Sequence, residues 1–247
     1  MAKQDGLFPL IGTIDNLTFS KSPFGYLAKK KTGPTRKQVL KNKQFERTRE
    51  NAADFKTAVR TATLVRQSLR PILRGSANIW LNGRMNRLLL QAVRSDKTHS
   101  RGQKAMQPAA LSIIKGFEIN HQNTFSRRKG VPCKIKKNTR KSVMQLTIPS
   151  FIPTTALTPP DGATHFEIVS ISATVDFNKN TWSNAIERSS LIAISRRKTK
   201  PLSLQHPITG KAGEAQLQAV GVLFYKMIDG LEKLLKGGAG KVVEAGE

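Results

Sequence analysis

The sequence has a single cysteine, four histidines and no long apolar run. Cys133 alone cannot form an intramolecular disulfide or build a thiolate metal site. His99, His121, His165 and His206 are scattered, and none is paired at metal-ligand spacing. No stretch approaches the roughly 20 apolar residues of a transmembrane helix, and no apolar segment follows the first residues, as it would in a signal peptide. These absences predict a cytoplasmic protein that needs no metal or cofactor.

Acidic residues are also scarce, because 16 Asp and Glu stand against 42 Lys and Arg, a net charge of +26. The excess is uneven: residues 1–141 hold 31 basic and 7 acidic residues, whereas residues 142–247 hold 11 and 9. Like charges repel in a compact state, so the basic part predicts a polyanionic partner. Nucleic acid is the commonest such partner, followed by an anionic membrane or an acidic protein.

Sites for catalysis are weakly supported. Glu46, Glu50 and Asp54 recur every four residues, as a carboxylate site for a divalent metal would require. Neighbouring Lys43, Arg47 and Arg49 favour ion pairs within the helix instead. Ser/His/Asp catalysis has no local signature. We therefore expect no enzymatic activity and no small-molecule substrate.

Two other segments have partial features of a phosphate-binding loop and of a reactive cysteine. Residues 236–241, KGGAGK, resemble a phosphate-binding loop but lack the following Ser or Thr and the helix. We expect a flexible linker there. Cys133 lies among cations that would lower the pKa of its thiol, but no neighbouring base indicates a nucleophile.

The first part of the chain predicts strands and then helices. Residues 7–31 are typical of a small antiparallel meander, with tight turns at Asp15-Asn16 and Pro23-Phe24-Gly25. Apolar residues at helical spacing then predict one helix that ends near Pro71 and a second over residues 77–94. Two apolar stripes with a short join indicate an antiparallel helix pair.

The second part predicts strands separated by turn residues. Alternating or β-branched runs occupy residues 111–120, 143–148, 165–177, 190–195 and 217–228, and Val242-Val243 could add an edge strand. Strands at this spacing favour an antiparallel β-sandwich. The sequence therefore predicts an α+β protein with two domains. Residues 1–107 would form the basic meander and helices, and residues 108–247 the sandwich with a basic segment at 126–141.

Charge runs and helical arginine rows supply the candidate nucleic-acid-binding residues, since planar guanidinium groups suit phosphate oxygens. These candidates are Lys29, Lys30, Lys31, Arg36, Lys37, Lys41, Lys43, Arg47, Arg49, Arg66, Arg70, Arg74, Arg84, Arg87, Arg127, Arg128, Lys129, Lys134, Lys136, Lys137, Arg140 and Lys141. Phe19, Phe24, Tyr26 and Phe45 lie near cations, but no motif of stacking aromatics is recognisable. We expect sequence-tolerant contacts to phosphates.

Several stretches resemble an uncharacterised family of small basic proteins found in Bacteroidota. "GTIDNLTFSKSPFGYLAKKK" at residues 12–31 and "FERTREN" at 45–51 match the family's start and first helix. "GFEIN" at 116–120, "PPDGATHFEI" at 159–168 and "GVLFYKMIDGLEKL" at 221–234 resemble its later landmarks. Ser20 replaces an expected aromatic residue. The resemblance implies one coherent architecture and no particular chemistry.

The leading hypothesis is a non-enzymatic nucleic-acid-binding protein whose neutral half forms homo-oligomer contacts, with residues 217–225 as a possible sheet edge. The main alternative is a structural assembly protein, such as a particle, filament or phage-like component that packs nucleic acid on a basic face. An enzyme acting on nucleic acid and a membrane-surface protein are weaker alternatives.

Overall fold

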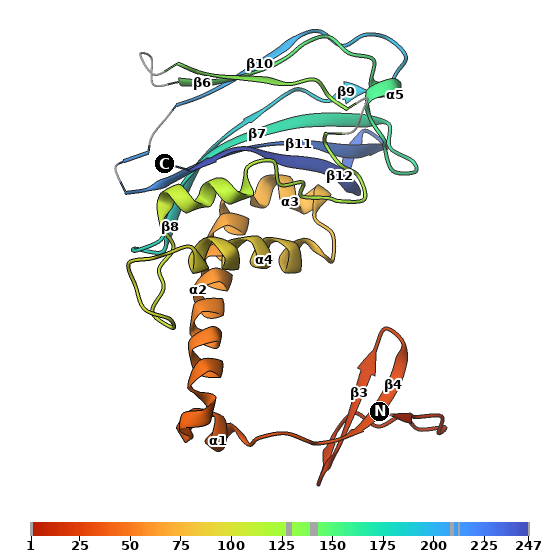
Figure 1. The fold of residues 1–247 in the computed structure, drawn as a ribbon. Coiled ribbons are helices and arrows are strands. Elements are labelled where there is room, and N and C mark those ends of the chain that lie inside the picture. Colours follow the sequence, from red (N-terminus) through yellow and green to blue (C-terminus); the bar gives the residue numbers. More distant parts are fainter. Residues whose placement is uncertain (1, 127–129, 139–142, 208–209, 212, 247) are drawn as a thin grey trace. The chain divides into compact units, whose positions relative to one another are not determined.

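A computed structural model describes residues 2–126, 130–138, 143–207, 210–211 and 213–246, with the side chain of Lys137 excepted. The chain divides into two compact units, residues 1–49 and 50–247 (Figure 1). The boundary expected at 107/108 therefore lies inside the second unit. The helices do not separate from the sheets because they share one hydrophobic core with the β-strands.

Unit 1 (residues 1–49) contains a small antiparallel sheet in the order β1-β4-β3-β2. Its strands are β1 (Ala2–Lys3), β2 (Gly12–Ile14), β3 (Leu17–Ser22) and β4 (Gly25–Lys30). Asp15 takes a positive φ of 50° in the tight turn between β2 and β3, as the Asp-Asn pair predicts. The meander expected in this region is confirmed.

The rest of unit 1 is a short helix, α1 (Arg36–Lys41), and a 3₁₀ turn, η1 (Lys43–Phe45). Thr35 caps α1 by accepting the Gln38 amide, and the Gln38 side chain accepts the Thr35 amide in return. This capping box supplies partners for two otherwise free donors. None of residues 2–49 is buried, so unit 1 has no hydrophobic core.

Three helices lie in or extend into unit 2 (residues 50–247): α2 (Glu46–Ser68), α3 (Arg70–Ser76) and α4 (Leu81–Arg94). As expected, the first long helix ends near Pro71, because α2 stops at Ser68. Pro71 then occupies the first turn of α3, where its missing N–H is not needed. The helical region expected as a pair is thus three helices. In Figure 1, α4 runs across α2.

Two antiparallel sheets form the rest of unit 2. The larger has the order β12-β11-β7-β8, with β9 also paired to β7, and the smaller has the order β10-β6-β5. The larger sheet contains β7 (His165–Asp176), β8 (Thr181–Arg188), β9 (Ile192–Ala193), β11 (Ala215–Ile228) and β12 (Leu231–Gly246). The smaller contains β5 (Lys134–Asn138), β6 (Val143–Ile148) and β10 (Leu202–Pro207). A short helix, α5 (Pro153–Ala156), follows β6.

The five-stranded sheet is the middle of three layers (Figure 1). One core lies between its helical side and α2–α4, and includes Val65, Ile72 and Leu89 with Val169 and Leu223. The other lies between the two sheets. Because β-strand side chains alternate between faces, one sheet contributes to both cores. The α+β class with antiparallel sheets is confirmed.

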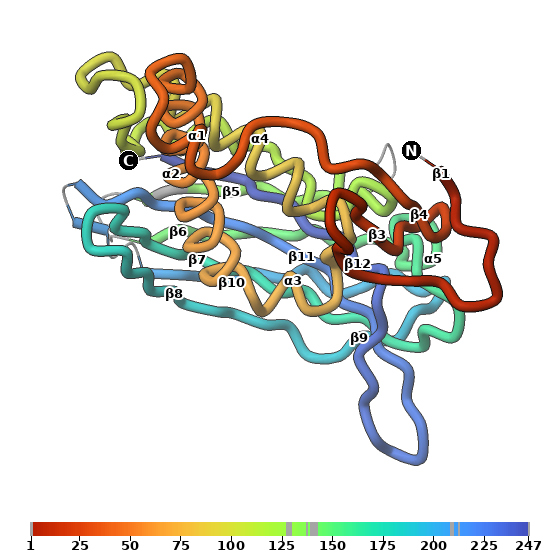
Figure 2. The backbone as a smooth tube through the Cα atoms, turned by 90° about the horizontal axis from the view of Figure 1, so that it is seen from below, coloured from red at the N-terminus to blue at the C-terminus, as the bar shows by residue number. Residues whose placement is uncertain are grey.

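Several local predictions differ from the structure. Residues 111–120, expected as a strand, begin within a 3₁₀ helix, η2 (Pro108–Ile114), which is followed by a bridge from Glu118 to Lys241. The expected linker KGGAGK lies within β12, and residues 217–225 form the middle of β11, between β12 and β7, so they offer no free edge. Figure 2 shows β11 and β12 continuing into a hairpin that projects from unit 2.

Gly221 of β11 and Gly240 of β12 are explained by the close approach of α3. A Cβ on Gly221 would lie 2.6 Å from Cγ2 of Ile72, and one on Gly240 would lie 2.8 Å from the same atom. A Cβ on Gly75 would likewise lie 2.9 Å from Leu223 Cδ2. Any side chain would push the helix off the sheet. The glycine-rich stretch therefore provides a flat contact surface.

Candidate nucleic-acid interface

Unit 1 presents most of its cations to solvent. Residues 1–49 carry eleven Lys and Arg against three Asp and Glu, a net charge of +8. The exposed candidates are Lys29, Lys30, Lys31, Arg36, Lys37, Lys41, Lys43 and Arg47. Solvated cations on a unit without a core can contact phosphates at little desolvation cost. These side chains lie at the surface, but their exposure alone does not define a site.

Arg49 has a structural role within unit 1. Its guanidinium donates hydrogen bonds to the carbonyl oxygens of Val39 and Asn42, at 2.8 and 2.9 Å. These carbonyls lie at the end of α1, where four C=O groups lack helical partners. A cation there also interacts favourably with the helix dipole.

Some arginines of the helical rows in unit 2 form hydrogen bonds within the protein, and others line a groove at the surface. Arg66 donates to Thr63 Oγ1 at 2.9 Å and to Asn86 Oδ1 at 3.4 Å, and burial lowers the pKa of its guanidinium. Arg84 donates to the Glu118 carbonyl at 2.5 Å, and its guanidinium carbon lies 4.7 Å from the centre of the Phe117 ring. Both side chains hold the fold together, which leaves them poorly suited to a ligand.

Arg70 and Arg74 open into a groove between α3 and β8, about 370 Å³ in volume, which we call the Trp182 groove. Its lining residues are Gln67, Arg70, Pro71, Arg74, Trp182, Asn184, Ile186 and Arg188. Trp182 is 40% exposed, so part of its indole is open to a ligand. None of these lining residues carries a carboxylate.

The walls of the Trp182 groove are held by hydrogen bonds from both sides. Asn184 Nδ2 donates to the Ser68 carbonyl at the end of α2, at 2.7 Å. Arg188 donates to Glu167 Oε2 at 2.9 Å, and the Tyr225 hydroxyl donates to the same oxygen at 2.8 Å. Burial first, and then Glu167, raise the pKa of Tyr225 to about 12. Because Glu167 offsets the charge of Arg188, the net positive charge comes from Arg70 and Arg74.

Sequence reasoning identified Arg70 and Arg74 but missed Trp182 and Arg188. The missed strand, residues 181–188, follows a turn in which Asn180 has a φ of 57°. Side chains of a strand alternate between its two faces, so the even-numbered residues, which include Trp182 and Arg188, lie on the same face. That alternation after an Asn-rich turn could have indicated the hairpin, but it could not have indicated its contact with α3.

The described lysines of the basic segment 126–141 do not line this groove. Lys134 and Lys136 are exposed on β5, the edge strand of the three-stranded sheet, in the layer opposite the helices. Lysines on an edge strand also discourage pairing with other sheets. The side chain of Lys137, and Arg127, Arg128, Lys129, Arg140 and Lys141, lie outside the described residues. Lys134 and Lys136 therefore lie apart from Arg70 and Arg74, on a different sheet from the one that lines the groove. Arg87 lies exposed on α4.

Asp54 and Cys133, which the sequence raised as candidates for metal binding and nucleophilic chemistry, lie in surroundings that do not favour those roles. Asp54 is buried, and its Oδ1 accepts the Gly102 amide at 3.0 Å. Across the described part of the chain, no three His, Cys, Asp or Glu side chains gather as a metal site would require. Burial raises the pKa of the Cys133 thiol, with Lys241 opposing it, so the expected lowering is wrong because desolvation outweighs the cations.

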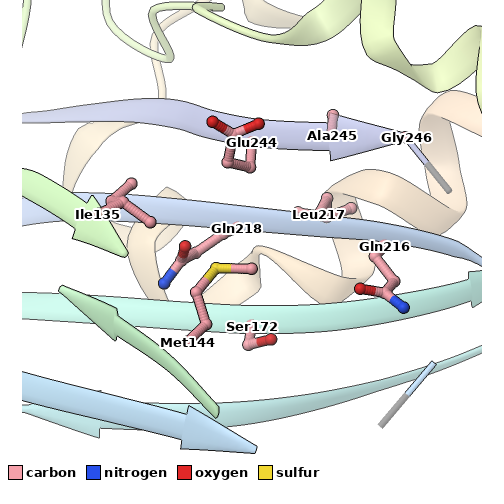
Figure 3. Close-up of a pocket in the computed structure, with 9 residues that line it drawn as sticks. All are labelled: Ile135, Met144, Ser172, Gln216, Leu217, Gln218, Glu244, Ala245 and Gly246. Atoms are coloured by element: carbon pink, nitrogen blue, oxygen red, sulfur yellow. The ribbon is translucent and has the colours of Figure 1, made fainter. Parts of the chain in front are cut away.

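A separate cavity of about 350 Å³ opens between the two sheets (Figure 3). Gln216 and Gln218 project into it from β11, and Ile135 and Met144 line it from the facing sheet. Gln218 is fully buried, and neither amide atom has a hydrogen-bond partner among the described residues. An unpaired buried amide is costly, so this cavity suits water or a small neutral molecule with a donor and an acceptor.

No family model and no curated protein matches the sequence. The resemblance to the basic Bacteroidota family stays a prediction. Of the helices that the structure describes, none is long and apolar enough to span a membrane.

Proposed function

We propose that this chain is a non-enzymatic nucleic-acid-binding protein that contacts mainly phosphates and tolerates different sequences. The Trp182 groove carries the proposal, because Arg70 and Arg74 line the same groove as an exposed indole and no lining residue is acidic. Guanidinium groups bind phosphate oxygens in a planar fork, and an aromatic ring accepts any base on its face. The exposed lysines of unit 1 would add further phosphate contacts.

The net charge favours nucleic acid, rather than a second copy of this chain, as the binding partner. Residues 1–49 have a net charge of +8, and residues 50–247 have 31 basic and 13 acidic residues, a net charge of +18. Two copies of either unit would repel each other unless a polyanion lay between them. A bound phosphate chain removes that repulsion and releases its own counterions.

The test is the salt dependence of binding, measured by fluorescence anisotropy with labelled DNA and RNA of mixed sequence. If about eight phosphates are engaged, the log–log slope is about −7. Arg70→Ala with Arg74→Ala should weaken binding and reduce the slope by about 2, since each phosphate contributes about 0.9. Different sequences should bind with similar affinity.

A matched control is Arg196→Ala with Arg197→Ala, which removes the same charge from an exposed segment outside the groove. This control should change the slope and the affinity much less. Equal loss in both double variants would reject the groove as the site. No binding by the unaltered protein at low salt would reject the proposed function.

The second candidate is a structural assembly protein, and the apolar surface of unit 1 favours it. The exposed large apolar residues there are Leu7, Phe8, Leu10, Ile11, Ile14, Leu17, Phe24 and Leu40. A unit with so much exposed apolar surface and no core gains stability when a partner covers it. Light scattering after size exclusion and negative-stain microscopy should then show large particles or filaments, whereas a discrete monomer or dimer contradicts assembly.

A further inference from the structure

One face of the unit 1 sheet gathers aromatic, aliphatic and cationic side chains. In the strand register, Ile14 lies opposite Leu17 on β2 and β3, and Lys21 lies opposite Tyr26 on β3 and β4. Directly opposed residues in an antiparallel pair point to the same face, and so do residues two apart. The aromatic face therefore includes Ile14, Leu17, Phe19, Lys21, Tyr26 and Lys30, together with the small residues Ala2, Gly12 and Ala28.

The aromatic face differs sharply from the opposite face. The other face carries mainly small polar residues and lysines, as in the opposed pair Thr18 and Lys29. On the aromatic face, Phe19 and Tyr26 occupy neighbouring strands on a diagonal, and Lys21 Nζ lies 5.6 Å from the centre of the Tyr26 ring. The cations thus lie beside the rings, and no strand of this sheet contains an acidic residue.

We propose that the aromatic face binds single-stranded nucleic acid, with bases stacked on Phe19 and Tyr26 and phosphates contacted by Lys21 and Lys30. This inference rests on the proposed function and specifies the form of its ligand. Aromatic side chains on a basic surface are the usual platform for unpaired bases. In a duplex, the bases are stacked on one another and cannot reach a sheet face, so the aromatic face selects single strands.

The charge of unit 1 decides against other occupants. A second copy of the face would bring Lys21 and Lys30 against their equivalents, within a unit of net charge +8, and the repulsion would oppose pairing. Leu17 is 47% exposed at the same face, so apolar contact area remains open to a partner. A polyanion with flat apolar groups satisfies both the cations and the rings, and a nucleic-acid strand has this chemistry.

The first experiment compares single and double strands with the full chain, using oligo(dT) of about 20 nucleotides and a duplex of the same length. Phe19→Leu with Tyr26→Leu keeps apolar side chains and every charge. The affinity for oligo(dT) should fall at least about tenfold, because each stacked base contributes about that much. The affinity for the duplex, which depends on phosphates, should change less than about twofold.

The second experiment uses the unaltered protein and does not depend on the variant folding. Oligonucleotides with 5-iodouracil crosslink to aromatic side chains under ultraviolet light, and mass spectrometry locates the crosslinked peptides. Crosslinks should fall on Phe19 and Tyr26. Crosslinks confined to Trp182 would overturn the aromatic face while supporting the Trp182 groove.

The outcomes separate this inference from the proposed function. If the protein binds both ligands and the double variant loses neither, the aromatic face is rejected and nucleic-acid binding stands. If the protein binds neither ligand, both proposals fall. If light scattering shows that the double variant abolishes self-association instead of oligo(dT) binding, a second copy occupies the face and the inference is overturned.

Discussion

The ring of His206 on β10 is joined to the hydroxyl of Ser170 on β7, with Nε2 2.8 Å from Oγ, inside the β-sandwich. His206 is 1% exposed, and its Nδ1 has no hydrogen-bond partner among the described residues. Burial lowers the pKa of this imidazole, while the charge of Glu187 opposes the shift. The interior between the sheets therefore contains a titratable contact.

This contact predicts a loss of stability in mild acid. The pKa of His206 is lower in the folded than in the unfolded chain, so the unfolded chain takes up the proton first as pH falls. The stabilising contribution is complete above the unfolded pKa of about 6.5 and declines below it. Urea unfolding between pH 7.5 and 5.5 should show a smaller decline for His206→Gln, and an unchanged decline would contradict the assignment.

The close packing of α3 on the sheet predicts that Gly221→Ala destabilises the protein. The new methyl group would lie 2.6 Å from Ile72 Cγ2 and 3.3 Å from the Ala239 carbonyl oxygen, and overpacking of this kind costs about 1–3 kcal/mol. Thermal unfolding measures the effect. Gly83→Ala is the control, because a Cβ there meets nothing within 4 Å in α4 and should stabilise the helix by up to about 1 kcal/mol. Equal effects in the two variants would argue against the tight contact.

Arg84 and Arg87 lie on the same helix but should respond differently to replacement by lysine. Arg84→Lys loses the stacking on Phe117 and the paired donation to the carbonyls of Glu118 and Ile119, so the free energy of unfolding should fall by about 1–2 kcal/mol. Arg87 is exposed, and Arg87→Lys should change it by less than about 0.5 kcal/mol. Urea unfolding tests both, and a stable Arg84→Lys variant would contradict the structural role.

Binding measurements complete that comparison. Arg84→Lys should retain the affinity for nucleic acid at a temperature where it is folded, since its guanidinium contacts the protein itself. The Arg70→Ala and Arg74→Ala double variant should show the reverse, with normal stability and weaker binding. Coupled loss of both properties in either protein would show that the fold and the Trp182 groove are not separable.

Gln218→Leu should stabilise the β-sandwich. The Gln218 amide is buried with neither atom paired to a described residue, and removal of an unpaired polar group relieves a cost of about 1 kcal/mol or more. Gln216→Leu, at the same cavity but half-buried, should change stability by less than about 0.5 kcal/mol. Thermal unfolding compares the two. Destabilisation by Gln218→Leu would mean that solvent or a ligand completes the hydrogen bonds of the amide.

Local sequence patterns correctly predicted those strands and turns whose conformation depends mainly on adjacent residues. The alternation within residues 165–177 predicted β7, and the Asp15-Asn16 turn predicted the β2–β3 hairpin, because pleat and turn geometry depend on a few adjacent residues. The prediction of a linker at residues 236–241 was wrong, because the conformation of this stretch depends on residues that are distant in the sequence. Glycines look flexible in isolation, but a Cβ on Gly240 would meet Ile72 of α3 and one on Gly238 would meet the carbonyl oxygens of Val222 and Gly75.

The candidate site was predicted in part. Arg70 and Arg74 follow from helical spacing, and so did Arg66 and Arg84, which the structure engages in contacts with the protein. Nothing local distinguishes the two kinds of arginine. Trp182 is more than 100 residues from Arg70, so their meeting depends on how β8 packs beside α3.

By itself, the sequence determined the charge of the chain, the alternation that builds its strands and the turns that join them, since these depend on composition and on neighbouring residues. The tertiary structure decided which cations form contacts within the protein and which are exposed to solvent. It also brought Trp182 into the same groove as Arg70 and Arg74. It also put Phe19 and Tyr26 on one face of a sheet. The physical reason is that strand register and layer packing join residues whose separation along the chain carries no information about their contact.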